Sequence, residues 1–440
     1  MTLPLSGTAP FFCAVSILLV PFAIIGVCLV NTGLTRSRSA AHSIMASLCA
    51  IAIAVVAYFV CGFSWQGIAG VSAHSLAAPG RHWNWIAAEP LFLRGLRLDG
   101  SAASLIVLLG LFSVALVAVI PLGSGGDRWR IGAICASTVL LAGWTYPLFA
   151  HWAWGGGWLE RLGAAHGLGH GFVDCGGAGT IQVVGGLTAL SIAWVLGPRR
   201  GKYGPGGMMV ALPGHNAVYV LFGSMLAWVG WLGLNFAGSV LFAGLRPERF
   251  SLIAINTTLA ASVALLTVVV LTRLRFGKPD ASLSANGWVG GLVAGSAACG
   301  LISPAAAALV GLVAGILVTF GVEWCESKLQ VDDPGGAISV HALCGIWGLL
   351  AVGLFARFPA GMPGAAGEVL PGRIPGQWIA QLVGIATLIG FVLPLTYGLN
   401  WLLNLLLPQR VASEGERQGL DLHELGAGAY PEFLTHDEQW

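Results

Sequence analysis

A histidine and a glutamine stand at matching places in two near copies of one short motif. The first copy covers residues 174–182 and reads DCGGAGTIQ, and the second covers residues 333–341 and reads DPGGAISVH, at a constant offset of 159 residues. An imidazole can accept and release a proton near neutral pH, whereas a glutamine amide only donates and accepts hydrogen bonds. The pair of Gln182 and His341 therefore predicts a site that can take up one proton but cannot relay it between two titratable groups.

The sequence around these motifs is typical of a protein embedded in a lipid bilayer. Of its 440 residues, 56% are hydrophobic and only 9% are charged, and the mean hydropathy is +0.81. A soluble domain carries about 25% charged residues. Apolar runs of about 20 residues recur along the chain, each long enough to cross about 30 Å of hydrocarbon. The net charge of +2 gives no reason to expect a nucleic-acid partner. The expected fold class is an all-α polytopic membrane protein.

The apolar runs predict eleven transmembrane helices. They cover residues 10–31, 42–66, 101–122, 130–149, 174–197, 212–238, 250–273, 285–302, 304–323, 337–357 and 376–406. Basic residues follow the odd-numbered helices, and the positive-inside rule makes that side cytoplasmic. We expect a multi-pass protein of the cell membrane with its N-terminus outside. A transmembrane domain over residues 1–407 would be followed by a cytoplasmic tail over residues 408–440.

The predicted helices place one motif copy at the end of each half of the chain. Helices 1–5 end with the first copy, helices 6–10 end with the second, and a long helix 11 follows. Five helices per half give the halves opposite orientations, and inverted repeats are typical of channels and transporters with a midplane site. We expect Gln182 and His341 to face each other there, where polar residues mark function. The alternatives are a chance match in Gly/Ala-rich sequence and a histidine satisfied within the core.

Acidic and aromatic residues flank the motifs. Asp174 and Asp333 precede predicted helix starts, where a carboxylate caps the helix and complements its dipole. Asp174 lies on the outer side, so it could also support an entering cation. Four tryptophans crowd that same side: Trp144, Trp152, Trp154 and Trp158. Most are expected to anchor the protein at the membrane interface, and one that faces a vestibule could bind a small cation over its ring.

Signals for catalysis, cofactors and metals are weak. The nine cysteines form no C-x-x-C pair and lie mostly in apolar runs, which favours small packed hydrophobes over a disulfide or metal framework. P-loop, nucleophile-elbow and zinc spacings do not occur, so we expect no cofactor and no metal. Ser339 is the one obvious nucleophile near His341, and an enzyme is therefore disfavoured. The N-terminus has no basic n-region, so no cleaved signal peptide is predicted.

Several blocks of the sequence resemble the ammonium transporter (Amt/Rh) family, specifically its Amt branch, over residues 10–432. The residues that carry the resemblance are 150–157 (AHWAWGGG), 174–199, 230–239, 286–293, 332–348 and 419–430. The resemblance implies a homotrimer of eleven-helix subunits for nitrogen uptake, each subunit with its own narrow hydrophobic pore for ammonium and ammonia. In the family an outer site gathers ammonium with a Trp, a Ser and a supporting Asp, which match Trp154, Ser239 and Asp174.

The resemblance also implies a gate and an inner pair of histidines, and here the sequence departs from the family. The family gate is two stacked Phe rings. The first matches Phe112, whereas the second falls on Leu234, with Phe236 nearby as a substitute. The second pore histidine matches His341, but the first falls on Gln182.

The glutamine leads to competing hypotheses for function. A bare cation is costly in an apolar pore, so a pore that strips a proton and passes neutral ammonia excludes K⁺ by chemistry. With Gln182 opposite His341, we expect slower conduction, poorer discrimination against K⁺, or a mainly sensing role. An ammonium channel or transporter is the first hypothesis. An ammonium sensor with little flux is the second, and an unrelated solute or gas channel is the third.

A regulatory partner is implied by the resemblance alone. Family members of this kind are shut from the cytoplasmic side by a trimeric PII-type signal protein. The tail of this chain carries Leu425 and Ala427 where family members often have His and Glu. Coupling through the tail is therefore left open by the sequence.

Overall fold

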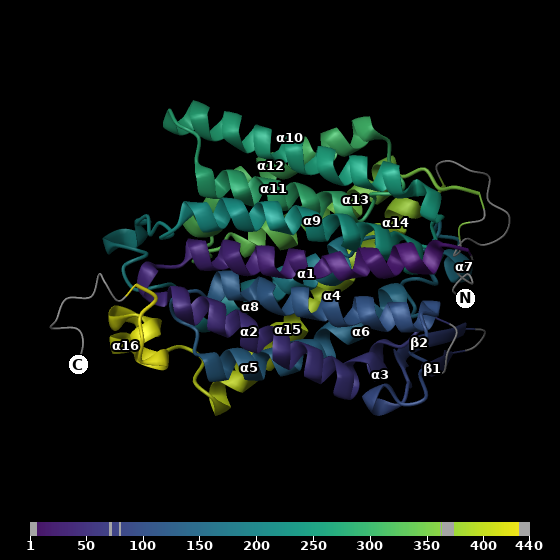
Figure 1. Ribbon diagram of the computed structural model, residues 1–440, viewed down its shortest axis with the longest axis horizontal. Helices are drawn as coiled ribbons and strands as arrows, with labels where there is room; N and C mark the ends of the chain where they lie inside the picture. Colours follow the sequence, from purple (N-terminus) through teal and green to yellow (C-terminus); the bar gives the residue numbers. More distant parts are fainter. Residues whose placement is uncertain (1–6, 70–72, 79–80, 361, 363–373, 431–440) are drawn as a thin grey trace.

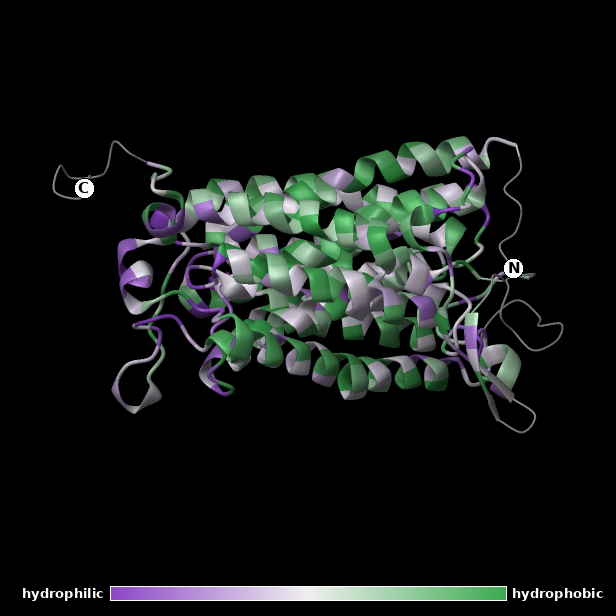
Figure 2. Ribbon diagram, turned by 90° about the horizontal axis from the view of Figure 1, so that it is seen from below, coloured by the Kyte–Doolittle hydropathy of each residue, from purple (hydrophilic) through white to green (hydrophobic). Residues whose placement is uncertain are grey.

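The helices of this protein lie side by side in one bundle whose middle is apolar. The computed structural model describes residues 7–69, 73–78, 81–360, 362 and 374–430. Most helices run along the longest axis of the molecule (Figure 1). Hydrophobic residues dominate the length of the bundle, while hydrophilic residues gather at its two ends (Figure 2). We call these ends the tail end, where α16 (Ser413–Gln418) lies, and the hairpin end, where β1 and β2 lie.

All eleven predicted segments are helical. The long elements are α1 (Ala9–Leu34), α2 (Ala40–Ala57) continued by α3 (Phe63–Gln66), α4 (Ala102–Gly125), α5 (Ile131–Leu140) continued by α6 (Tyr146–Trp154), α8 (Val184–Leu196), α9 (Ala217–Leu241), α10 (Phe250–Phe276), α11 (Ala281–Ser296), α12 (Pro304–Ser327), α13 (Cys344–Phe355) and α14 (Gln377–Thr387) continued by α15 (Leu393–Leu406). Wider π-helical turns join or precede several of them: η2 (Tyr58–Gly62), η4 (Leu141–Thr145), η5 (Ala178–Val183), η8 (Ile338–Leu343) and η9 (Leu388–Val392).

The helical membrane fold is confirmed, but the count of eleven spans is not. Within the described ranges, 10 helices are long and apolar enough to cross a membrane. Helix α11 has 16 residues, which is shorter than the roughly 20 that a span requires. It was predicted over residues 285–302, but it ends at Ser296 and a turn follows. Conversely, the predicted helix 130–149 continues to Trp154, so this residue ends a helix rather than opening a loop.

Among the described residues, an antiparallel hairpin is the one departure from an all-α fold. Strands β1 (Ala73–Ala78) and β2 (Arg81–Ala87) pair so that Ala73 lies opposite Ala87, with an irregularity after His74. These strands were not predicted from the sequence. The hairpin lies at one end of the bundle (Figure 1), where backbone groups can also hydrogen-bond to water.

The first helices of the two halves, α1 and α9, pack in opposite directions through glycines. A Cβ atom added at Gly33 would touch Val220, one at Gly223 would touch the Gly26 carbonyl, and one at Gly230 would touch Ala23. The order of these contacts runs backwards along α9, so the two helices are antiparallel. Small residues let the two backbones approach closely, as in other membrane helix pairs.

Gly230→Val is expected to destabilise the protein by about 1–3 kcal/mol, because the new Cβ atom meets the backbone nitrogen of Ala23 and overpacks the α1–α9 contact. Thermal unfolding in detergent measures the effect. Gly398→Val in α15 is the control, since a Cβ atom there meets nothing within 4 Å. Equal melting temperatures for the two variants would contradict this account of the helix pair.

Candidate functional site

The two copies of the motif meet inside the bundle through their final polar residues. The His341 Nδ1 atom lies 2.7 Å from Gln182 Oε1, and both side chains are buried. Gln182 belongs to η5 and His341 to η8, so both sit on the wider π-helical turns. The predicted contact between the two residues is confirmed, and it joins the two halves of the chain.

Each motif copy begins with a carboxylate that caps the following turn. Asp174 Oδ2 accepts hydrogen bonds from the backbone N–H groups of Gly179 and Thr180 at 2.9 and 2.8 Å. Asp333 Oδ2 accepts one from the N–H of Ile338 at 2.8 Å, which is the equivalent position of the second copy. A helix start leaves such N–H groups without partners, and a carboxylate satisfies them. The predicted capping role of both aspartates is confirmed.

Glycines let the two copies form the same turn and approach each other. Gly177 and Gly336 have φ values of +82° and +67°, a left-handed conformation that glycine adopts without strain. A Cβ atom at Gly186 would meet Ala342, and one at the matching Gly345 would meet the Val183 side chain. Any larger residue would separate the turns that carry Gln182 and His341.

The amide orientation assigns the proton on the imidazole. A carbonyl oxygen only accepts, so Nδ1 of His341 donates to Gln182 and Nε2 keeps its lone pair. Within the described part of the chain, the Nε2 amide group of Gln182 is buried with no hydrogen-bond partner. His341 also lines a cavity of about 10 Å³ with Asn31 and Asn286, roughly the space of one water molecule. The site thus offers one neutral acceptor, on the side of His341.

A second group of predicted residues assembles towards the hairpin end. The Trp154 indole Nε1 donates to the Asp174 carbonyl oxygen at 2.9 Å. The Asp174 Oδ1 oxygen is buried and accepts no well-formed hydrogen bond from the described residues. Ser239 is also buried, with its hydroxyl 3.2 Å from the Cys299 sulfur. The structure therefore places Trp154 directly beside Asp174.

Phe242 also contacts this group of residues, although it was not predicted from the sequence. Its ring stacks on Trp154 with a centroid separation of 4.1 Å and an interplanar angle of 3°. Phe242 follows the last residue of α9, three residues after Ser239. Residues three apart on a helix lie on the same face. That spacing from Ser239 is the signal that could have identified Phe242.

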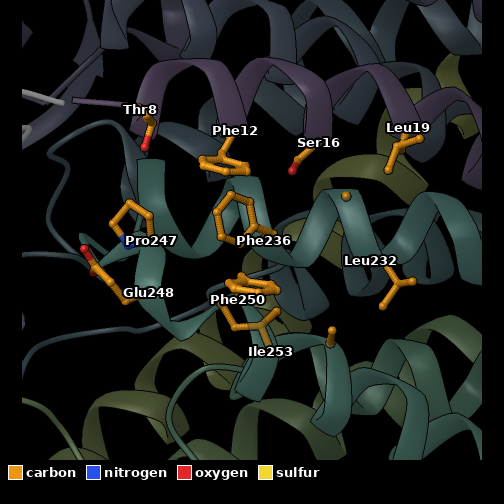
Figure 3. A pocket seen from close by; sticks show the side chains of 12 residues that line it. Thr8, Phe12, Ser16, Leu19, Leu232, Phe236, Pro247, Glu248, Phe250 and Ile253 are labelled. Atoms are coloured by element: carbon orange, nitrogen blue, oxygen red, sulfur yellow. The ribbon is translucent and has the colours of Figure 1, made fainter. Parts of the chain in front are cut away.

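The structure does not bring the predicted gate residues into one stack. Leu234 is buried in the core and Phe112 is half-buried on α4. Phe236 is directed between Phe12 and Phe250 (Figure 3), in a groove of about 420 Å³ between α1, α9 and α10. Leu234 and Phe236 are about 200° apart around the helix, so they face different surroundings. Among the described residues, no aromatic ring contact joins Phe112 to Phe236.

The tryptophans of the hairpin end do not act mainly as interfacial anchors. Trp152 is only 1% exposed and donates its indole N–H to the Trp85 carbonyl at 2.8 Å. It also packs against Trp158, with the ring centroids 5.9 Å apart. Trp144, at 39% exposed, is the one of the four with a broad surface for lipid contact. The anchor prediction is wrong for Trp152, which is buried because the hairpin and neighbouring helices cover it, and Trp154 is buried as well.

A buried ion network ties the two motif helices together at the tail end. Arg199 follows α8, and its side chain makes two hydrogen bonds to Asp332, Nε to Oδ2 at 2.9 Å and Nη2 to Oδ1 at 3.0 Å. Its Nη1 atom lies 3.1 Å from Asp127 Oδ2. Burial alone would raise the pKa of Asp332, but Arg128 and Arg199 outweigh it and lower the pKa to about 2. The network was not predicted, because its members lie in three separate loops.

The described part of the tail, residues 408–430, packs onto the tail end and caps two helices there. Asp421 Oδ1 accepts from the His42 backbone N–H at 2.7 Å, at the start of α2. Glu424 Oε2 accepts from the Ile131 N–H at 2.9 Å, at the start of α5, and lies 3.0 Å from His42 Nε2. Burial would raise the pKa of Glu424, but these hydrogen bonds lower it. The residues 431–440 of the predicted tail lie outside the described residues.

A comparison with known protein families shows which family this chain belongs to. The model of the Ammonium Transporter Family matches residues 11–430, which is nearly the whole chain. The chain belongs to the ammonium transporter family. It is therefore a multi-pass membrane protein of that family, as the resemblance predicted.

Individual members of the family are similar over most of the chain. Ammonium transporter Amt2 of Archaeoglobus fulgidus is 35% identical over 432 residues, covering 96% of this chain and 88% of the relative. The ammonium transporter of Bacillus subtilis is 30% identical over 424 residues, covering 96% and 98%. Among solved structures, a sensor Amt protein has a TM-score of 0.80 at 26% identity, covering 94% of this chain and 97% of that one. Mep2 of Candida albicans shares the fold, with a TM-score of 0.76 at 23% identity and coverage of 96% and 91%.

Proposed function

We propose that this protein conducts ammonium or ammonia across the membrane through a pore in each subunit. The observation that carries the proposal is the buried contact between His341 and Gln182 at the junction of two inverted motif copies. Membership in the ammonium transporter family supports the same conclusion. The names of its relatives, which describe transporters rather than enzymes, support it as well.

Ammonium would first be held near Trp154, Asp174 and Ser239. A small cation gains stability over an indole face and beside a carboxylate. The buried and uncommitted Oδ1 of Asp174 supplies negative charge next to Trp154, and the Ser239 hydroxyl can accept a hydrogen bond once it leaves Cys299. Phe112 and Leu234 remain our proposal for the gate beyond this site. Phe236 has no place in that proposal, because it lines the groove beside α1 (Figure 3).

His341 would then accept the proton that ammonium loses. Its Nε2 lone pair is available, since Nδ1 donates to Gln182. Neutral ammonia crosses an apolar pore at far lower cost than a bare cation, so this step excludes K⁺. Gln182 holds and orients the imidazole but does not titrate. The proton must leave from the same residue that took it up.

The orientation and partners of the protein complete the proposal. The positive-inside rule puts the tail end, with Arg128, Arg199 and Arg410, in the cytoplasm. We further propose a homotrimer in which a second copy covers the groove around Phe12 and Phe250, since both rings are exposed there. A PII-type signal protein would have to meet the cytoplasmic face beside the docked tail. The tail from residue 408 onward is assigned to that side as a separate domain.

An ammonium sensor is the second candidate, and Gln182 favours it. The structure lacks a second imidazole opposite His341, so a relay between two titratable groups is impossible. The solved structure with a TM-score of 0.80 is named a sensor Amt protein. A sensor would bind ammonium at the same outer residues and pass little flux.

Currents on a solid-supported membrane distinguish the two candidates. Purified protein is pulsed with ammonium and then with K⁺ at fixed ionic strength, beside a Gln182→His variant. Transport predicts an ammonium current in the native protein that K⁺ does not produce. Binding of ammonium without current, together with a large gain of current in Gln182→His, would replace the transporter with the sensor. A protein that shows neither an ammonium current nor ammonium binding would contradict both candidate functions.

A further inference from the structure

The indole face that could hold a cation is already covered by an aromatic ring of the protein itself. Phe242 lies parallel to Trp154, with centroids 4.1 Å apart and planes within 3°. Two rings at this separation leave no space for an ion between them. A cation over an aromatic face needs to lie within about 6 Å of the ring centroid with that face free. The face of Trp154 that Phe242 covers is therefore closed to ammonium.

The rest of Trp154 is held in place and largely buried. Its indole N–H donates to the Asp174 carbonyl, and the residue is only 7% exposed. Trp154 is thus fixed by a hydrogen bond on one edge and by a ring on one face. The ring contact is the one that a binding cation would have to replace, and an aromatic pair contributes only about 0.5–1.5 kcal/mol beyond its buried area.

Phe242 lies half-buried against the core, just beyond the end of α9. It directly follows the last residue of α9, and Gly244 beyond it has a φ of +63°. The backbone N–H of Phe242 donates to the Gly238 carbonyl, but the stack with Trp154 is the one ring contact of Phe242 in the described part of the chain. A change of its side-chain rotamer would uncover Trp154 without unwinding the helix.

We propose that Phe242 occupies the ammonium position on Trp154 when the site is empty, and that the cation must displace it to bind. This inference rests on the proposed ammonium site and adds a residue that sets its affinity. Ser239 precedes Phe242 by one helical turn, so opening the ring would leave the cation between the indole and the Ser239 hydroxyl. The site would then bind only in the fraction of molecules whose ring is displaced.

Removing the ring tests the proposal. Phe242→Ala is expected to lower the half-saturating ammonium concentration about twofold to tenfold, the range that an aromatic contact of this kind represents. The measurement is the ammonium dependence of the transport current, supported by tryptophan fluorescence during an ammonium titration. Phe391→Ala is the matched control, because it also removes a phenylalanine ring that packs on a tryptophan. The ring centroids of Phe391 and Trp152 lie 5.1 Å apart. It should leave the half-saturating concentration unchanged.

The outcomes separate this inference from the proposed function. An unchanged half-saturating concentration in Phe242→Ala would contradict the proposal that Phe242 competes with ammonium and would make Phe242 a packing residue. A higher concentration would also contradict it and would make Phe242 a cation ligand. Phe242→Leu keeps apolar volume but removes the ring, so it serves if the alanine variant folds poorly, with a smaller shift in the same direction. If the native protein shows neither current nor ammonium binding, the proposed function fails first.

Discussion

Replacing His341 with glutamine is expected to lower the ammonium flux at least about a hundredfold, the lower range for loss of a positioned proton acceptor. Glutamine can keep a hydrogen bond to Gln182, so the variant removes the titratable group while preserving the buried polar contact. The outer residues are unchanged, and ammonium binding near Trp154 should persist. Current measurement and a binding titration on the same preparation check the two expectations together.

Exchanging the pair is the control for this result. The double variant Gln182→His with His341→Gln moves the single imidazole to the other side of the contact. Recovery of flux would show that one imidazole in either position suffices, whereas continued loss would show that the position beside Asn31 and Asn286 matters. An ammonium flux in the single variant His341→Gln equal to that of the native protein would contradict the role of His341 as proton acceptor.

Replacing Arg199 with alanine is expected to destabilise the protein by about 3–5 kcal/mol, the cost of leaving a buried charge without its partner. The Arg199 and Asp332 side chains are both almost fully buried and are joined by two side-chain hydrogen bonds. At neutral pH Asp332 is ionised in the native protein, and Arg128 alone would have to compensate its charge. Unfolding in mixed detergent micelles measures the difference.

Arg275→Ala is the matched control for the buried network. Arg275 also makes two hydrogen bonds to a carboxylate, that of Glu323, but the two side chains are 35% and 45% exposed. An exposed pair contributes about 0–1 kcal/mol. Similar losses for Arg199→Ala and Arg275→Ala would show that burial does not determine the strength of these pairs. A network role also predicts that Arg199→Ala loosens the contact between Gln182 and His341, because Asp332 directly precedes the second motif copy.

The features that the sequence predicted correctly are those with local or repeated causes. Long apolar runs predict membrane helices because each must satisfy its own backbone in lipid. The offset between the motif copies predicted the contact of Gln182 with His341. The residue type and position of Asp174 and Asp333 predicted that each caps the helical turn that follows it. The count of spans was less certain, since α11 is short and its apolar run continues into a turn.

Other features depend on contacts between distant segments, which no local pattern encodes. Phe236 and Phe242 are both phenylalanines near the end of α9, yet Phe236 lines a groove beside α1 and Phe242 covers Trp154. The helical repeat puts the two residues on different sides of α9, but only helix packing decides what each ring contacts. The capping of α2 and α5 by Asp421 and Glu424 joins residues hundreds of positions apart.

By itself, the sequence determined that this protein spans a membrane, that its two halves carry one repeated motif, and that an imidazole meets an amide where the copies join. Hydrophobic length and the chemistry of single side chains are sufficient for those conclusions. The tertiary structure decided that Trp154 is covered by Phe242, that Arg199 and Asp332 join the two motif helices, and where the tail packs. These contacts arise from the close packing of helices, in which the position of one side chain depends on all of its neighbours.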